Sequence, residues 1–348
     1  MENKKYIQNQ YNDKKNIAVL LVNFGGPSSL NDVKPFLYNL FSDPTVLNFP
    51  LASFYRKPLA WLISNMRDMT SREMYKKIGG ISPLISITYL QAEKLQSLFK
   101  INNILVDVFV GFRYCKPFIE DTLTKIKELN YKRLIVLPLY PQYSYTTTGS
   151  VQLVVNEWLK KNINNHPDIH LIKDWYKDED YIQAYVSLIN SSLENLDLRS
   201  TEIIFSAHSI PLFNINNGDP YEKHITETIN LIIKKLEWKK RWHIAYQSKI
   251  GPIKWLEPDT PSILKEIGKR NNKANILVVP ISFVCEHVET IFEIGNLYKE
   301  IANKVGIKKF VRVPALNTNK YLIQALYNQV LDCLEDNQVN IKELILTK

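Results

Sequence analysis

Cysteine is scarce in this chain, and its few cysteines lie far apart. Only three occur among the 348 residues, at positions Cys115, Cys285 and Cys333. Disulfide frameworks and structural zinc sites bring cysteines together at short, paired spacings, so this distribution predicts neither of them. We therefore expect a protein of the reducing cytoplasm.

Long apolar runs are also missing. No apolar stretch reaches the roughly 20 residues that a helix needs to cross a bilayer. The first 16 residues are polar and include acidic side chains, unlike a secretion signal. The sequence predicts neither secretion nor a membrane-spanning helix.

Nucleotide and nucleic-acid signatures are absent as well. Gly25 and Gly26 follow an apolar run, but they do not form G-x-G-x-x-G and no P-loop lysine follows, so a tight turn explains them better. The formal charge of +9 suits an anionic partner such as nucleic acid, acidic lipid or a carboxylate-bearing substrate. Because the lysines are dispersed rather than gathered in a basic block, we expect no nucleic-acid partner.

What the sequence does contain is a regular alternation of short apolar runs with segments of helical period. The predicted strands lie at residues 17–23, 104–110, 133–138, 169–172, 202–206, 243–246, 275–280 and 310–313. The predicted helices lie at residues 122–129, 151–160, 181–193, 221–236, 286–302 and 321–334. Such alternation is typical of parallel sheets with helical crossovers.

The length and the repeated alternation predict an α/β fold of two doubly wound lobes. The polar stretch KNINNHPD interrupts the pattern between residues 161 and 175. We therefore place the first lobe at residues 16–170 and the second at residues 171–318, followed by a C-terminal segment at residues 319–348.

Ligands of such sheets bind beyond the carboxyl ends of the strands, so the residues after each predicted strand are the first candidates. His208 follows one strand, and its imidazole suits a base or a metal ligand, although a buried histidine often serves local hydrogen bonding alone. If a helix begins near Glu286, then Glu286, Glu289 and Glu293 share one of its faces. That face is either a solvated acidic stripe or a site for a cation or a proton.

A series of segments resembles the motifs of the ferrochelatase family, in the family's order. The segments are VNFGGP, FLYNLFSDP, YKKIGGISPL, GFRY, PLYPQYSYTTTGS, FSAHSIP with GDPY, YQSKIGP with IKWLEPDT, and VVPISFVCEHVETIFEI. They run from about Val22 to Glu293. The collinear series, which includes SAHS, YQSKxGP and HxET, is highly specific.

The resemblance implies a chelatase fold of two Rossmann-like lobes with a porphyrin cleft between them and a C-terminal helix packed back on the first lobe. It implies a lyase that inserts Fe²⁺ into protoporphyrin IX, releases two protons and forms protohaem in the last step of haem biosynthesis. A porphyrin or haem carrier, and a related chelatase using coproporphyrin or another divalent metal, remain the alternatives.

The resemblance also implies roles for individual residues. His208 is the proton acceptor or metal ligand, Glu289 delivers metal or relays protons, and Glu286 and Glu293 are possible relay groups. The residues implied to contact the porphyrin ring or its propionates are Phe24, Tyr75, Ser82, Arg113, Tyr114 and Trp255.

Two departures from the family pattern qualify these expectations. Gly295 and Leu297 stand where relatives often carry acidic residues, which puts an outer metal relay in doubt. The tail ends at Lys348 with Cys333 alone, so we expect no iron–sulfur cluster and no other cofactor, with Fe²⁺ acting as a substrate.

An apolar segment at residues 49–63 resembles the lip of membrane-associated members of the family. Arg56 and Lys57 can meet anionic headgroups there while Trp61 sits at the interface. Pro58 predicts two short pieces rather than one helix. We therefore expect a cytoplasmic protein, with peripheral contact to the inner face of the cell membrane as one interpretation of this segment and closure over the core as the other.

Overall fold

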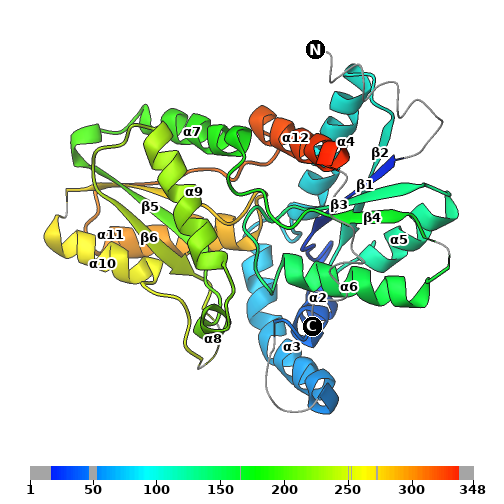
Figure 1. The fold of residues 1–348 in the computed structure, drawn as a ribbon. Coiled ribbons are helices and arrows are strands. Elements are labelled where there is room, and N and C mark those ends of the chain that lie inside the picture. Colours follow the sequence, from blue (N-terminus) through cyan, green and yellow to red (C-terminus); the bar gives the residue numbers. More distant parts are fainter. Residues whose placement is uncertain are drawn as a thin grey trace.

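Two parallel sheets, each covered by helices, form the framework of the chain (Figure 1). This computed structural model describes residues 17–46, 53–164, 166–249, 251, 253–271 and 273–336. Within those residues each sheet has four strands. The predicted α/β fold of two lobes is confirmed.

The first sheet has the strand order β2-β1-β3-β4, and every neighbouring pair is parallel. Its strands are β1 (Ile17–Asn23), β2 (Val106–Phe112), β3 (Arg133–Pro138) and β4 (Asp168–Leu171). The last of them ends at Leu171, one residue beyond the predicted end of the first lobe.

The second sheet repeats this arrangement in the order β6-β5-β7-β8, again fully parallel. Its strands are β5 (Thr201–His208), β6 (Trp242–Gln247), β7 (Asn275–Pro280) and β8 (Lys309–Arg312). Each of the eight predicted strands is present, with ends shifted by no more than a few residues.

The central strands explain why the sequence folds this way. Every residue of β1 is buried, and β5 is buried up to Ala207. A strand covered on both faces has to be apolar along its whole length, which is the pattern of a central parallel strand. Each buried Val, Leu or Ile side chain contributes about 1.5–3 kcal/mol, so these two strands anchor the two lobes.

Helices cover both faces of each sheet. The first lobe carries α4 (Leu84–Ile101), α5 (Ile119–Glu128) and α6 (Thr148–Lys161). The second carries α7 (Glu179–Leu193), α8 (Leu212–Asn216), α9 (Tyr221–Lys235), α10 (Thr260–Arg270) and α11 (Lys299–Lys304). The short 3₁₀ turns η1 (Leu30–Asp32) and η2 (Leu198–Ser200) complete the connections.

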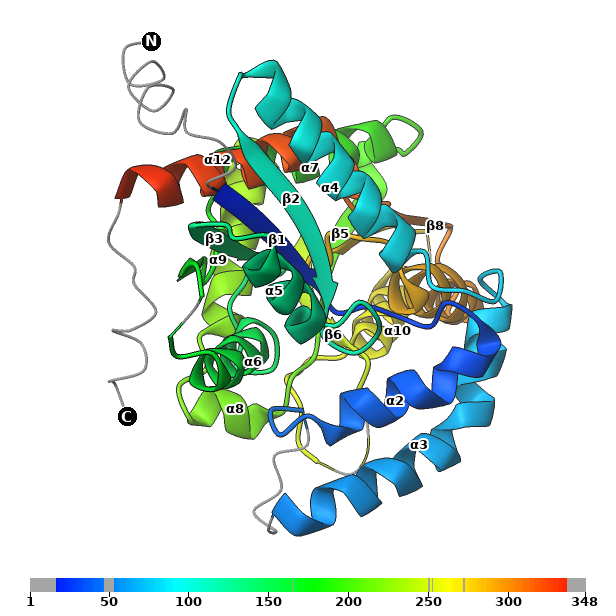
Figure 2. The same ribbon diagram turned by 90° about the vertical axis from the view of Figure 1, so that its right-hand side faces the viewer.

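The helices α2 (Val33–Ser42) and α3 (Ser53–Lys76) pack against each other and project from the first lobe (Figure 2). Phe49 to Ala52 of the predicted apolar segment lie outside the described residues. From Ser53 onward the chain is one helix with Pro58 inside it, so the prediction of two short pieces is wrong for this part. A proline inside a helix loses one backbone hydrogen bond, and packing of α3 on α2 offsets that cost.

The C-terminal helix α12 (Lys320–Asp336) lies against α4 and β3 of the first lobe and against α7 (Figure 1). The phenolic ring of Tyr327 lies tilted against that of Phe99 of α4, with ring centroids 4.9 Å apart. Helix α12 therefore contacts both lobes.

The predicted helix at residues 286–302 has an unexpected form. Glu289–Tyr298 is a π-helix, labelled η3, and it continues directly into α11. π-Helices are rare in proteins overall, and those that occur are often found at functional sites. Because it begins at Glu289, Glu286 lies before the helix, and the predicted three-carboxylate face does not form.

Candidate functional site

His208 is the last residue of β5, at the carboxyl edge of the second sheet. Its Nδ1 lies 2.6 Å from the carbonyl oxygen of Ser209. A carbonyl oxygen can only accept, so Nδ1 carries a proton and Nε2 keeps a lone pair in the neutral ring. The side chain is 32% exposed, which leaves that nitrogen accessible to a ligand.

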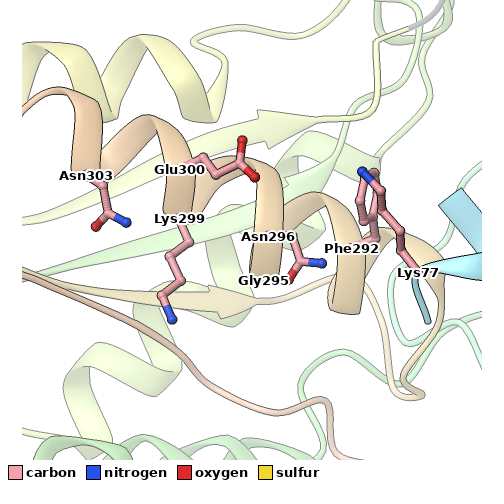
Figure 3. Close-up of a pocket in the computed structure, with 7 residues that line it drawn as sticks. All are labelled: Lys77, Phe292, Gly295, Asn296, Lys299, Glu300 and Asn303. Atoms are coloured by element: carbon pink, nitrogen blue, oxygen red, sulfur yellow. The ribbon is translucent and has the colours of Figure 1, made fainter. Parts of the chain in front are cut away.

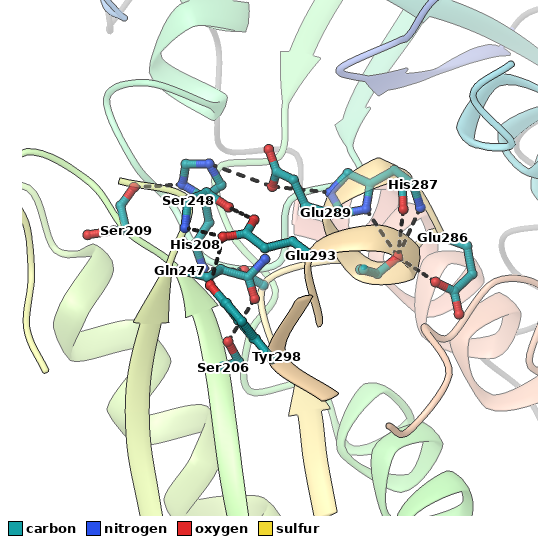
Figure 4. Close-up of polar contacts among 12 residues, drawn as sticks. Ser206, His208, Ser209, Gln247, Ser248, Glu286, His287, Glu289, Glu293 and Tyr298 are labelled. Atoms are coloured by element: carbon teal, nitrogen blue, oxygen red, sulfur yellow. Dashed lines mark hydrogen bonds and ion pairs between the residues drawn. The ribbon is translucent and has the colours of Figure 1, made fainter. Parts of the chain in front are cut away.

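The carboxylate of Glu289 lies between two imidazoles (Figure 4). Its Oε2 is 3.7 Å from Nε2 of His208 and 3.4 Å from Nε2 of His287. Both separations are longer than a good hydrogen bond. The three groups therefore form a cluster in which the buried Oε2 of Glu289 and Nε2 of His287 have no hydrogen-bond partner.

Two neighbouring carboxylates in this cluster have opposite pKa shifts. Burial opposes ionisation of Glu289, but His208 and His287 outweigh it and lower its pKa to about 2. Burial raises the pKa of Glu293, and the charge on Glu289 raises it further. Carboxylates whose pKa values are pushed apart are suited to different roles in proton transfer.

Glu293 is held by three donors from the second lobe. It accepts hydrogen bonds from the backbone N–H and the hydroxyl of Ser248, at 3.0 and 2.5 Å, and from the hydroxyl of Tyr298 at 2.7 Å. Glu293 lies within the π-helix, four residues after Glu289, and these hydrogen bonds fix its carboxylate. This pair is the part of the predicted acidic face that the structure brings together.

Glu286 has a separate environment. Its carboxylate accepts hydrogen bonds from Arg312 at 2.6 Å and from the backbone N–H of Ala315 at 3.0 Å, and it also contacts Thr290. In Figure 4 it points away from the Glu289 and Glu293 side chains. This contact explains the burial of Glu286 and separates it from the cluster around His208.

The first lobe supplies an aromatic wall. The ring of Phe24 meets that of Tyr114 edge to face, with centroids 4.6 Å apart, and also approaches Phe36. Val288, the residue before Glu289, packs against the same cluster. The aromatic residues of the first lobe therefore adjoin the carboxylate of the second.

Arg113 and Tyr114 both contact a buried acid that the sequence interpretation did not single out. The guanidinium of Arg113 lies 2.8 Å from Asp43 and donates to the hydroxyl of Ser150 at 2.7 Å. The Tyr114 hydroxyl donates to the same carboxylate at 2.7 Å. Because that hydroxyl is engaged and Tyr114 is almost fully buried, its clearest contact with the site is through Phe24.

The remaining predicted binding residues surround this wall. Burial raises the pKa of Tyr75, and the charge of Glu289 raises it further, which places the phenol near the carboxylate. Ser82 is buried against Gly26, where an added Cβ would meet the serine side chain at 2.5 Å. Gly25 has a φ of +90°, so the predicted tight turn needs both glycines.

Trp255 comes from a loop that is tied to the residues following His208. It forms an antiparallel bridge with Pro211, and the neighbouring Leu256 donates its N–H to Ile210 at 3.1 Å. Among the described residues, no group of three or more His, Cys, Asp or Glu side chains is placed to hold a metal ion.

Comparison with known proteins matches this chain to the ferrochelatase family model over residues 16–333. The chain belongs to the ferrochelatase family. The ferrochelatase of Gloeothece citriformis is 43% identical over 95% of this chain and 86% of its own length. The ferrochelatase of Trichodesmium erythraeum is 42% identical with the same coverage. Membership makes the chain an enzyme of the chelatase class of lyases, whose reaction inserts iron into a porphyrin in haem synthesis.

Solved structures agree on the fold. SirB from Bacillus subtilis, solved with Fe³⁺, matches 93% of this chain and 99% of its own with a TM-score of 0.55 at 11% identity. DR2241 from Deinococcus radiodurans, described as similar to chelatases, matches 90% of this chain and 55% of its own with a TM-score of 0.51 at 10% identity. At such low identity these likenesses support the chelatase fold alone.

Gly295, one of the two positions that depart from the family pattern, faces a cavity beside the π-helix. Gly295 lines a cavity of about 380 Å³ together with Lys77 and Lys299, and Glu300 is the single carboxylate among its lining residues (Figure 3). The Lys77 ammonium lies 5.0 Å from the centre of the Phe292 ring. This lining is mainly basic and amide-bearing, which does not favour an acidic metal relay along that face.

Two residues of the site were missed by the sequence interpretation. His287 lies in the quoted segment, two residues before Glu289, and this spacing was the available signal. Asp43 lies in FLYNLFSDP, but Arg113, Tyr114 and Ser150 are distant from it in sequence, so nothing local indicated these contacts. His287 meets Glu289 within the second lobe, and Asp43 meets Arg113 within the first lobe, so the fold of each lobe was needed to show them.

Proposed function

We propose that the porphyrin substrate is protoporphyrin IX and that His208 and Glu289 carry out its metallation with Fe²⁺. The observation that carries the proposal is the accessible Nε2 of His208, with its lone pair, 3.7 Å from an ionised carboxylate. A free porphyrin must lose two pyrrole protons when iron enters. An imidazole beside a carboxylate is suited to accept them, because the carboxylate stabilises the imidazolium that forms.

The carboxylates of Glu289 and Glu293 have different roles in this proposal. Glu289, held ionised, attracts the incoming Fe²⁺ and balances charge on His208 and His287. Glu293, with its raised pKa, accepts a proton that leaves the cluster. Imidazole nitrogen and carboxylate oxygen are both ligands for borderline divalent ions, so preference for iron depends on geometry and supply.

The first lobe provides most of the porphyrin surface, and Trp255 of the second lobe adds to it. Phe24 and Trp255 contact the macrocycle, and Arg113, oriented by Asp43 and Ser150, donates to a propionate with Tyr75 and Ser82 nearby. Flat aromatic contacts favour a distorted ring nearer the transition state. No resident cofactor or iron–sulfur cluster is needed for these steps.

An anaerobic absorbance assay tests the proposal. Purified protein is mixed with Fe²⁺ and either protoporphyrin IX or coproporphyrin, and the metallation rate is compared with that of the enzyme-free mixture. We expect the larger acceleration with protoporphyrin IX. Faster turnover of coproporphyrin would show that coproporphyrin is the preferred substrate. No acceleration with either porphyrin would contradict the proposal.

We also propose that α3 contacts a membrane surface, so that the protein is cytoplasmic and peripheral to the inner face of the cell membrane. Tyr55, Trp61, Leu62 and Met66 of α3 are all exposed, at 49–73% of their surface. No helix in the described part of the chain combines the length and apolarity needed to cross a bilayer. Exposed apolar side chains on α3, next to the aromatic wall, would suit a poorly soluble porphyrin that enters from lipid.

Liposome co-sedimentation tests the membrane proposal. The wild type should pellet with anionic vesicles, and a variant with Trp61, Leu62 and Met66 changed to serine should remain in solution. Ile101→Ser is the matched control, because Ile101 is 76% exposed on α4. Equal sedimentation of the triple variant and the wild type would exclude this surface.

A further inference from the structure

Asp219 is a buried carboxylate that joins the two lobes. It lies in the second lobe, before α9, and only 4% of its surface is exposed. Its Oδ2 accepts hydrogen bonds from the hydroxyl of Ser144 and the backbone N–H of Tyr145, both at 2.8 Å. Ser144 and Tyr145 belong to the loop between β3 and α6 of the first lobe. One carboxylate oxygen thus holds a first-lobe loop.

The other oxygen of Asp219 is connected to His208 through hydrogen bonds of Tyr221. Oδ1 accepts the backbone N–H of Tyr221 at 3.0 Å, at the start of α9. The hydroxyl of Tyr221 donates to the backbone carbonyl of His208 at 2.9 Å. Tyr221 is itself 5% exposed, so this connection from Asp219 to His208 is shielded from water.

His208 takes part in three hydrogen bonds that involve a side chain, and their partners differ in origin. Its backbone N–H donates to Ser282 at 2.8 Å, and its Nδ1 donates to the carbonyl of Ser209. Both of these partners belong to the second lobe. The third partner, Tyr221, is the one whose own position depends on a carboxylate that also binds the first lobe.

We propose that Asp219 is a positioning residue, which ties the placement of the His208 imidazole to the docking of the Ser144–Tyr145 loop. When the loop is seated, Asp219 fixes the start of α9, and Tyr221 fixes the backbone of His208 opposite Glu289. The inference rests on the proposed role of His208 in metallation. Displacement of a reacting group by about 1 Å can cost about 100-fold in rate, so such a link matters to turnover.

Asp219→Asn is a sharp test because three donors converge on the carboxylate. An asparagine has one oxygen and one NH₂ group, whereas both oxygens of Asp219 face N–H groups. Either orientation of the amide therefore places donor against donor. Tyr221→Phe is the milder companion, since it removes the hydroxyl bonded to His208 and keeps the ring.

Thr228→Val is the matched control on the same helix. Thr228 is fully buried in α9 and accepts a hydrogen bond from Gln142 of the first lobe at 3.2 Å. Its replacement breaks a buried contact between the lobes that does not lead to His208. The control therefore separates a general weakening of the lobe contact from loss of the specific connection.

Steady-state metallation gives the first measurement. In folded Asp219→Asn and Tyr221→Phe, kcat should fall by about 10-fold to 100-fold, the usual effect of removing a supporting partner. KM for the porphyrin should change little, and Thr228→Val should retain most of the wild-type kcat. Unchanged kcat in both test variants, or an equal loss in Thr228→Val, would overturn the proposal.

Nitrogen-15 NMR of labelled histidine gives a measurement that does not depend on activity. The His208 ring resonances should shift in Asp219→Asn and Tyr221→Phe and stay in place in Thr228→Val. If the wild type failed to metallate any porphyrin, the proposed function would fail while this spectrum still tested the connection. Unmoved His208 resonances in both test variants would overturn the connection itself.

Discussion

The two sheets have the same topology but carry different side chains at equivalent points. Leu139 donates its N–H to Val22 at 2.8 Å in the first lobe, and Ile281 donates to Ser206 at 3.1 Å in the second. In each case the donor follows the proline that ends the strand beside the central one. The two backbone frameworks therefore correspond in strand order and in this contact at the carboxyl edge.

The central strands show where the lobes diverge. β1 ends at Asn23 and leads into Phe24, whereas β5 ends at His208. The first lobe accordingly presents aromatic rings and a guanidinium, and the second presents imidazoles and carboxylates. In the proposed function, equivalent strand ends thus separate most of the macrocycle binding from the proton and metal chemistry.

Removing the imidazole should break this division most severely. His208→Ala should lower kcat by about 100-fold to 10,000-fold, because it removes the group placed to accept pyrrole protons. Stopped-flow metallation measures the effect, with His166→Ala as a control histidine whose Nδ1 contacts Pro167. Full activity in folded His208→Ala would remove His208 from the mechanism.

Neutralising the carboxylate should have the next largest effect. Glu289→Gln keeps the shape but removes the charge that stabilises the imidazolium, so kcat should fall by about 10-fold to 100-fold. Porphyrin affinity should change less. Glu300→Gln, on the same helical run but in the outer cavity, is the matched control. A larger effect on affinity than on kcat would assign Glu289 to binding.

A change in the first lobe should show the opposite pattern. Phe24→Leu should weaken porphyrin binding by about 2-fold to 13-fold, equivalent to the roughly 0.5–1.5 kcal/mol of an aromatic contact. Fluorescence quenching measures the affinity. Phe109→Leu serves as control, because Phe109 packs on Tyr131. Unaltered affinity with reduced kcat would place Phe24 in the chemistry instead.

The smallest effect concerns acid stability of the first lobe. Burial opposes ionisation of Asp43, but Arg113, Ser150 and Thr45 together lower its pKa. A lowered folded-state pKa adds stability above the unfolded value near 4, and that stability is lost as the pH falls through the folded value. Urea unfolding of Asp43→Asn between pH 5 and pH 3 should therefore show a weaker pH dependence than the wild type. An equal slope would show that Asp43 does not contribute.

The strands could be predicted because their apolar runs are local properties of the sequence. The pair α2 and α3 was not predicted as such, since Pro58 argues against a continuous helix and packing between the helices decides the outcome. The π-helix and the contact of Glu286 with Arg312 also depend on residues brought together by the fold. His208 and Glu289 were identified by motif, whereas their 3.7 Å separation depends on the pairing of β5 with β7, which brings the carboxyl ends of these two strands together.

Equilibrium porphyrin binding to the double variant His208→Ala, Glu289→Gln tests the division of labour most directly. The account predicts that protoporphyrin IX binds with a dissociation constant within about threefold of the wild-type value, or roughly 0.7 kcal/mol, while turnover is lost. Loss of porphyrin binding in the folded double variant would contradict the proposal that His208 and Glu289 perform the chemistry while other residues, mainly of the first lobe, bind the porphyrin.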